Sequence, residues 1–395
     1  MQTPDFLLIG GGIFGLPTAI ELRQRGYTVQ LINPGRIPHP LASSTDISKV
    51  VRMEYGADRE YADMAEQAID GWRAWNALFG ETLYHEVGFL LLCRQPMATQ
   101  AQAFERASYA CMNDKGYPPQ RHNAQTLAQA YPAFQKGYYQ DGFYNPTAGF
   151  VEAAYTLKKL KAYAQQLGIE IVEGQTAETL EKENGKVTAL RTREGQTFQA
   201  GHYIVCAGPN TPYLLPELQP MMRISGHPVF HLQAKESTLF QYPQFTVFAA
   251  DISNSGWYGF PIHPKEGVIK IARHGTGLTL HPEKDPRVVT AEDEAELRSF
   301  LAAALPALTD APIVYTRRCL YTDTLDGHFW IDRHPRWTNL SVATGGSGHG
   351  MKMGPVLGQI IADKVEQGQH RWSDRYDWRS FEGEVIYQEE ARSKA

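Results

Sequence analysis

The feature that most constrains the fold of this 395-residue chain is a glycine-rich turn close to its start. Residues 6–9 form an uninterrupted apolar run, as a strand buried on both faces requires. Gly10, Gly12 and Gly15 follow in G-x-G-x-x-G spacing, and the next residues have the apolar period of a helix. A strand, this turn and a helix predict a Rossmann-like unit that binds a pyrophosphate at the helix N-terminus.

The second predicted strand, residues 27–33, ends at Asn33. Units of this kind usually have Asp or Glu there to bind the adenosine ribose. An amide can accept from and donate to ribose hydroxyls, but without the assistance of charge. The amide disfavours a freely exchanging NAD and is compatible with a cofactor held by many contacts or by a covalent bond.

The same strand–turn–helix pattern recurs late in the sequence. Residues 340–343 predict a strand, a glycine-rich turn follows, and residues 356–365 have the period of a helix. Another buried strand ends at Ala207 and Gly208, and in a Rossmann-like sheet the end of such a strand lies beside the nucleotide. The sequence therefore predicts a second turn and helix N-terminus at the same ligand edge.

Between these blocks the sequence changes character. A helix is predicted over residues 59–79, whereas the intervening blocks hold short alternating strands and isolated helices such as 291–304. We predict an α/β fold with α+β elements, in which a sheet-based substrate domain is inserted into a Rossmann-like nucleotide domain. The expected nucleotide domain is discontinuous, over residues 1–85, 141–215 and 315–395, and the substrate domain comprises residues 86–140 and 216–314.

Composition excludes several classes of function. Lys and Arg number 38 against 43 Asp and Glu, a formal net charge of −5, which gives no electrostatic case for nucleic acid or an anionic membrane. Every long apolar segment meets a charge or a proline before it reaches transmembrane length. The four cysteines lack CxxC or Cys/His metal spacing and suggest a reducing compartment. We expect a soluble, cytoplasmic protein without a metal site.

Five further segments carry chemistry-bearing residues in a fixed order. They are SSTDISKVVRMEYG (43–56), WYGFP (257–261), the Lys270/His274 pair, CLYTDTLDGHFWID (319–332) and GGSGHGMKM (345–353). With the first glycine turn, they resemble the motifs of the monomeric sarcosine oxidase and N-methyltryptophan oxidase group of D-amino-acid-oxidase-type flavoproteins. The fructosyl amino acid oxidases are close relatives of that group. The resemblance spans nearly the whole chain and implies FAD as the cofactor.

Cys319 is the candidate for a covalent bond to the cofactor. The resemblance implies that the cysteine before this Tyr-Thr pair bonds to the 8α-methyl carbon of FAD. The residues agree in part, since Arg317 and Arg318 beside the thiol could lower its pKa and favour the reactive thiolate. The alternative is a buried cysteine without chemistry.

The resemblance also implies a reaction, the oxidation of a secondary amine such as an N-methyl or N-alkyl amino acid. A hydride equivalent passes from the carbon beside the nitrogen to the flavin, the imine hydrolyses, and dioxygen reoxidises the flavin to give hydrogen peroxide. The flavin supplies the organic chemistry, and the protein binds, orients and supplies charge. We therefore expect an FAD-dependent amine or amino acid oxidoreductase, a monomer or small homo-oligomer, whose partners are a small substrate and dioxygen.

Family positions imply roles for five side chains. Arg52 and Lys352 are expected to bind a substrate carboxylate, the arginine through its bidentate fork and the lysine as a point charge. Lys270 is expected to stabilise the anion formed as dioxygen is reduced. Tyr258 and His274 are expected at the wall around the amine, although one extra residue separates Tyr258 from Lys270.

Two positions depart from the sarcosine oxidases. Thr45 and Lys49 stand where those enzymes have histidine and arginine, so Lys49 is a candidate site residue that keeps the charge without the fork. A lysine at this position resembles the fructosyl amino acid oxidases. The alternatives are therefore a fructosyl amino acid or cyclic imino acid oxidase, a dehydrogenase with another acceptor, and a flavin-binding protein without turnover.

The remaining candidates are the residues expected to hold FAD. They come from the two glycine-rich turns, from strand ends between them and from the resemblance. The predicted cofactor-binding residues are Gly10, Gly12, Ile13, Phe14, Gly15, Asn33, Ser43, Ser44, Ala177, Ala207, Gly208, Cys319, Gly346, Ser347, Gly348, His349, Gly350 and Lys352.

Overall fold

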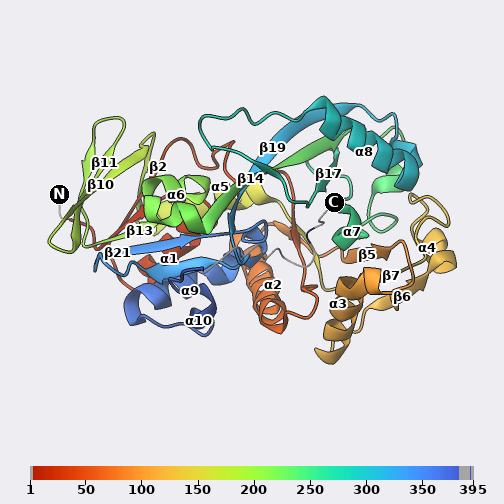
Figure 1. Cartoon of the computed structure of the whole chain (residues 1–395), viewed down its shortest axis with the longest axis horizontal. Coiled ribbons are helices and arrows are strands. Elements are labelled where there is room, and N and C mark those ends of the chain that lie inside the picture. Colours follow the sequence, from red (N-terminus) through yellow and green to blue (C-terminus); the bar gives the residue numbers. More distant parts are fainter. Residues whose placement is uncertain (1–2, 382–391, 393–395) are drawn as a thin grey trace.

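A computed structural model of the chain describes residues 3–381 and residue 392. Two large sheets lie side by side, with a small sheet at the outer end of the first (Figure 1). Among the described residues, no helix is both long enough and apolar enough to cross a membrane.

The first sheet has six strands and contains both glycine-turn units. All its neighbouring strands run parallel except the edge strand β20. In spatial order the strands are β20 (Trp330–Arg333), β21 (Leu340–Thr344), β13 (His202–Val205), β1 (Phe6–Ile9), β2 (Val29–Asn33) and β9 (Glu170–Glu173).

Both faces of this sheet are covered, which explains why its strands are continuous apolar runs. One face shares a core with four helices, which are α1 (Gly15–Gln24), α2 (Arg59–Phe79), α5 (Ala153–Gln166) and α9 (Gly354–Gln367). The other face packs on a small antiparallel sheet, formed by β10 (Ala177–Glu183), β11 (Lys186–Thr192) and β12 (Thr197–Phe198).

The second sheet has nine strands and is mostly antiparallel. Its path runs through β18 (Leu278–Thr279), β14 (Met222–Leu232), β17 (Ile269–Arg273), β16 (Trp257–Gly259), β15 (Val247–Ala250), β5 (Phe89–Cys93), β7 (Asp141–Asn145) and β6 (Gln120–Asn123), while β19 (Ile313–Thr324) also pairs with β14. On this sheet pack α8 (Ala291–Ala304) and, on the opposite core, α3 (Ala103–Asp114) and the short α7 (Ile252–Ser255).

The secondary structure confirms most of the predicted elements and changes one important connection. The helices predicted over 59–79 and 291–304 are α2 and α8, and the late strand–turn–helix unit is β21 followed by α9. The division into domains stays a prediction. Hydrogen bonding, however, puts 141–145 and 315–324, both expected in the nucleotide domain, into the nine-stranded sheet. Cys319 therefore lies on a strand of the second sheet that reaches toward the first.

Close contact between α1 and α9 allows a sharp test of this packing. A Cβ added at Gly358 in α9 would lie 2.6 Å from the backbone oxygen of Pro17 in α1. We expect Gly358→Ala to lower the free energy of unfolding by about 1–3 kcal/mol, because overpacking outweighs the better helix propensity of alanine. Gln359→Ala, at an exposed position of the same helix, is the control and should be neutral or stabilising. Equal stability of the two variants, measured by urea unfolding, would contradict the packing.

Candidate active site

A large cavity runs along the edge of the six-stranded sheet where its parallel strands end. It leaves ≈ 820 Å³ for water-sized molecules, and both glycine-rich turns line it. Fourteen predicted cofactor-binding residues line this cavity, namely Gly10, Gly12, Ile13, Phe14, Asn33, Ser43, Ser44, Ala177, Ala207, Gly208, Gly346, Ser347, Gly348 and Gly350. Of the other four, His349 and Lys352 line a second, smaller cavity, whereas Gly15 and Cys319 line neither.

The first glycine turn is built by close backbone contact. Gly10 has a φ of 113°, which favours glycine, and a Cβ at Gly15 would lie 1.9 Å from the Gly10 carbonyl oxygen. Gly15 therefore shapes the site by seating α1 against β1. The N-terminus of this ten-residue helix points its dipole at the cavity. The turn, the helix and the length of the cavity fit the pyrophosphate and extended form of FAD.

Asn33 has a structural task that the sequence did not predict. Its Oδ1 accepts a hydrogen bond from the Gly11 backbone N–H at 2.9 Å, and its Nδ2 donates to the Gly35 carbonyl at 2.7 Å. The Asn33 side chain thus holds the glycine turn in place through two hydrogen bonds. The backbone N–H of Ile13 donates to Ser44 Oγ at 3.1 Å on the opposite side of the turn.

The smaller cavity joins the large one at Lys49, Tyr321, Gly348 and Met351, which line both. It leaves ≈ 70 Å³ for water-sized molecules. The structure brings five of the six predicted catalytic residues to its wall, which are Lys49, Arg52, Tyr258, His274 and Lys352. Tyr258 lies on β16, which pairs directly with β17, the strand that carries Lys270.

Arg52 and Lys352 both lie close to one aromatic ring. The guanidinium carbon of Arg52 is 5.2 Å and Lys352 Nζ is 4.6 Å from the centroid of Tyr55. Both side chains are buried, although they face the cavity. Burial raises the pKa of the neighbouring Glu54 despite the Arg52 charge. Two buried cations at one end of a small cavity can bind an anionic group strongly.

Lys270 lies behind the cavity wall in a buried ion pair. Its side chain is 1% exposed, and Nζ lies 2.6 Å from Asp46 Oδ2 and donates to the Ser48 carbonyl. Burial keeps the ammonium of this lysine away from bulk solvent. It also lowers the pKa of Lys270 to about 8, although Asp46 opposes that shift.

Asp46 is a functional candidate that the sequence analysis missed. Burial alone would raise its pKa, but Lys270 and a hydrogen bond from His231 hold the pKa well below its usual range. The available signal was an acidic residue inside the TDISK segment, three positions before Lys49. The carboxylate is thus ionised and partly neutralises the Lys270 charge.

Cys319 lies beneath the junction of the two cavities. Lys49 Nζ is 3.7 Å from its sulfur, and the residue is 1% exposed. Burial would raise the pKa of the thiol, but Lys49 and Arg317 lower it below its ordinary value. Such a thiol has the thiolate character that nucleophilic attack requires.

The expectation that Arg318 acts on this thiol was wrong. Successive residues of a strand point to opposite faces, so Arg317 shares a face with Cys319 and Arg318 does not. Arg318 instead forms an ion pair with Asp293 and donates to the carbonyls of Gly226 and Val288. Lys49 supplies the second positive charge beside the sulfur.

Tyr321, two residues beyond Cys319, forms the partition between the cavities. Its hydroxyl is hydrogen bonded to Tyr258, and its ring stacks on His227 with centroids 4.1 Å apart. His274 lies on the same side, 6.3 Å from that ring. The aromatic and imidazole groups form one wall of the smaller cavity, as expected for Tyr258 and His274.

A dinucleotide cavity that opens into a buried, cation-lined pocket is the arrangement of a redox enzyme with a nucleotide cofactor. The family model of FAD dependent oxidoreductases (DAO) matches residues 5–364, and the chain belongs to this family.

Relatives within the family have several substrates. The chain is 27% identical to L-saccharopine oxidase of Schizosaccharomyces pombe, over 94% of this chain and 92% of the relative. It is 26% identical to monomeric sarcosine oxidase of a Bacillus species, over 92% and 93%. Among solved structures, fructosyl amine: oxygen oxidoreductase (Amadoriase I) of Aspergillus fumigatus superposes with a TM-score of 0.81 at 25% identity, covering 95% of this chain and 90% of that one. The three proteins are named for different amines, so these likenesses define the family and leave the substrate open.

Proposed function

We propose that the protein oxidises an N-methyl or N-alkyl amino acid with a compact apolar substituent, and that dioxygen is its electron acceptor. The observation that carries this proposal is the combination of cationic and apolar side chains in the lining of the smaller cavity. An amino acid with one carboxylate and an apolar substituent is complementary to both.

The cationic side chains of the cavity, Arg52 and Lys352, can bind a carboxylate. Both residues line the cavity. Arg52 directly follows β3 (Lys49–Val51), and Lys352 lies just before α9. Arginine offers two parallel N–H donors to a carboxylate, and lysine adds a point charge. Low local dielectric strengthens both interactions relative to water.

The apolar side chains of the cavity disfavour a sugar. They are Phe89 and Leu91 of β5, Phe104 of α3, Ile252 of α7, and Phe260. Buried hydroxyl groups without hydrogen-bond partners cost roughly 1–3 kcal/mol each. A fructosyl group carries several hydroxyls, whereas an alkyl or aryl substituent gains from burial against these side chains.

FAD fits the large cavity and, when bound, supplies the electron-accepting chemistry. The first glycine turn and α1 would hold its pyrophosphate, and the 345–350 turn would lie at the end nearest the substrate. Cys319 is proposed as its covalent attachment. Lys270 supplies a positive charge behind the cavity wall for the reduction of dioxygen.

A fructosyl amino acid oxidase is the second candidate, and two observations favour it. Lys49 stands at the junction of the cavities, where the sequence resembles that group, and the fold superposes on Amadoriase I over 95% of the chain. The two candidates differ in the polarity of the substituent on nitrogen, which a substrate panel measures directly.

The substrate proposal predicts which amino acids reduce the flavin. In an anaerobic screen, N-methyl amino acids with apolar side chains should bleach the visible flavin absorbance at least tenfold faster than the parent primary amines. With air present they should release one hydrogen peroxide per substrate. Fructosyl-glycine is the polar comparison and should be slower. Faster bleaching by fructosyl-glycine would favour the fructosyl amino acid oxidase. If no amine bleached the flavin, both proposed functions would be refuted.

The covalent attachment predicts a yellow precipitate after acid denaturation of the purified protein. Cys319→Ala should give a colourless precipitate and yellow supernatant, since this change removes the proposed attachment sulfur. Cys206→Ala, at another buried cysteine, is the matched control and should stay yellow. A wild-type precipitate without colour would refute the attachment.

The role of Lys270 predicts an asymmetric kinetic defect. Lys270→Met should slow flavin reoxidation by roughly 10²–10³-fold, the usual loss for one preorganised charge, with a much smaller effect on reduction. Wild-type reoxidation should fall as pH rises through about 8, because the ammonium loses its proton there, and the variant should lack this dependence. Lys235→Met, at an exposed position, is the control. Equal losses in both half-reactions, measured by stopped flow, would contradict the role.

A further inference from the structure

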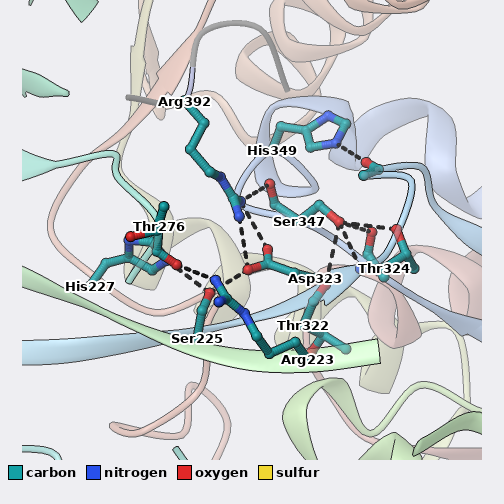
Figure 2. Close-up of polar contacts among 12 residues, drawn as sticks. Arg223, Ser225, His227, Thr276, Thr322, Asp323, Thr324, Ser347, His349 and Arg392 are labelled. Atoms are coloured by element: carbon teal, nitrogen blue, oxygen red, sulfur yellow. Dashed lines mark hydrogen bonds and ion pairs between the residues drawn. The ribbon is translucent and has the colours of Figure 1, made fainter. Parts of the chain in front are cut away.

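A buried ionic network lies behind the second glycine turn, and one of its members comes from a distant part of the chain. Figure 2 shows Arg392 pointing toward Asp323 of β19 and toward Ser347. The Arg392 guanidinium binds Asp323 through two parallel hydrogen bonds, each 2.9 Å long. Both residues are buried, with exposed fractions of 5% and 6%. A bidentate pair with so little access to water has a defined geometry, and removing one of its two charges has a large effect.

The same guanidinium also holds the turn. Arg392 NH2 donates to the carbonyl oxygen of Ser347 at 3.1 Å. Ser347 has a φ of 42°, a left-handed conformation that costs a non-glycine residue roughly 1 kcal/mol or more. Its N–H donates to the Thr322 carbonyl at 3.0 Å, so β19 and Arg392 fix this residue from two sides. A strained residue persists only where its surroundings over-determine it.

This network borders the place where electron transfer must occur. Ser347 and its neighbour Gly348 line the large cavity, and Gly348 and Tyr321 also line the smaller one. The guanidinium carbon of Arg392 is 6.0 Å from the Tyr321 ring centroid. Because substrate and flavin ring must meet to exchange electrons, a bound flavin would place its ring at this junction, near Ser347 and Tyr321, whereas Arg392 lines neither cavity.

The remaining groups of the network surround this ion pair with hydrogen bonds. Asp323 accepts a hydrogen bond from Ser225, whose Oγ lies 2.9 Å from His227 Nε2. Burial lowers the pKa of His227 well below its usual value, so this ring is neutral. Arg223 donates to the Thr276 carbonyl (Figure 2). Asp323 and Arg392 are the two opposite charges that pair directly. Removing either one would change the electrostatic potential at the junction of the cavities.

We propose that Arg392 is a positioning residue of the flavin site, which fixes the Ser347 turn and, with Asp323, sets the electrostatic potential at the ring end of the cofactor. This role rests on FAD occupying the large cavity and is independent of which amine is oxidised. Reduction makes the ring more negative, so a nearby positive charge favours the reduced state and a nearby carboxylate opposes it.

The test is the flavin reduction potential of purified holoenzyme, titrated anaerobically with dithionite and a reference dye. Arg392→Met leaves Asp323 uncompensated and should lower the potential. Asp323→Asn removes a negative charge from the network and should raise it. Each shift should be at least tenfold in the two-electron equilibrium, which is about 30 mV. The double variant R392M/D323N removes both charges and should lie between the single variants.

Opposite signs distinguish this role from a purely structural one, because a structural defect would move both variants in the same direction. Arg379→Met is the matched control, since Arg379 makes a similar bidentate pair with Asp326 outside both cavities. It should lower thermal stability without a shift in potential.

Two further variants keep the test decisive if a single charge removal prevents folding. Arg392→Lys retains the charge without the fork and should keep the potential within tenfold of wild type, while the neutral double variant retains no buried charge to destabilise it. Shifts of the same sign in R392M and D323N, no shift in either, or a shift in R392K as large as in R392M would overturn the proposal.

Discussion

Backbone contact at the glycine positions is the constraint on which both cavities depend. Gly15 allows α1 to begin directly against the end of β1, and Gly358 allows α9 to lie on α1. The helices that follow the two glycine-rich turns are therefore neighbours, and the turns meet at one edge of the sheet. A single cavity between them is long enough for a dinucleotide, and its inner end becomes the place where a second molecule can be bound. Each later feature of the site depends on this arrangement of backbone.

Burial then determines how the charged side chains behave. The ammonium of Lys270 and the carboxylate of Asp46 form an ion pair with almost no contact with water, and the Cys319 thiol lies close to Lys49 and Arg317. In such surroundings one charge changes the proton affinity of its neighbour far more than it would at the surface. The proton affinities of the Cys319 thiol and the Lys270 ammonium are therefore set by burial and by neighbouring charged side chains.

Local patterns predicted much of the fold. The period of residues 59–79, the strand–turn–helix units and the position of α8 follow from apolar spacing and glycine alone. Contacts between distant segments were not predictable in this way. The ion pair between Lys270 and Asp46 and the pairing of β19 with β14 were not predicted, because contacts between distant segments leave no periodic signal in the sequence. Asn33 shows the same limit: its position suggested a ribose contact, and its amide holds the turn. The roles of the catalytic candidates came from family resemblance and remain to be tested.

The alternation of β19 has an evolutionary consequence. Arg317, Cys319, Tyr321 and Asp323 occupy every second position, so all four lie on one face of the strand. A deletion or insertion of one residue ahead of them would turn Cys319, Tyr321 and Asp323 to the opposite face of the strand. Arg318 and the residues two and four positions after it would then take their place. A lineage that keeps these groups must therefore keep the phase of the strand: substitutions can change the four positions one at a time, whereas an insertion or deletion changes all four together.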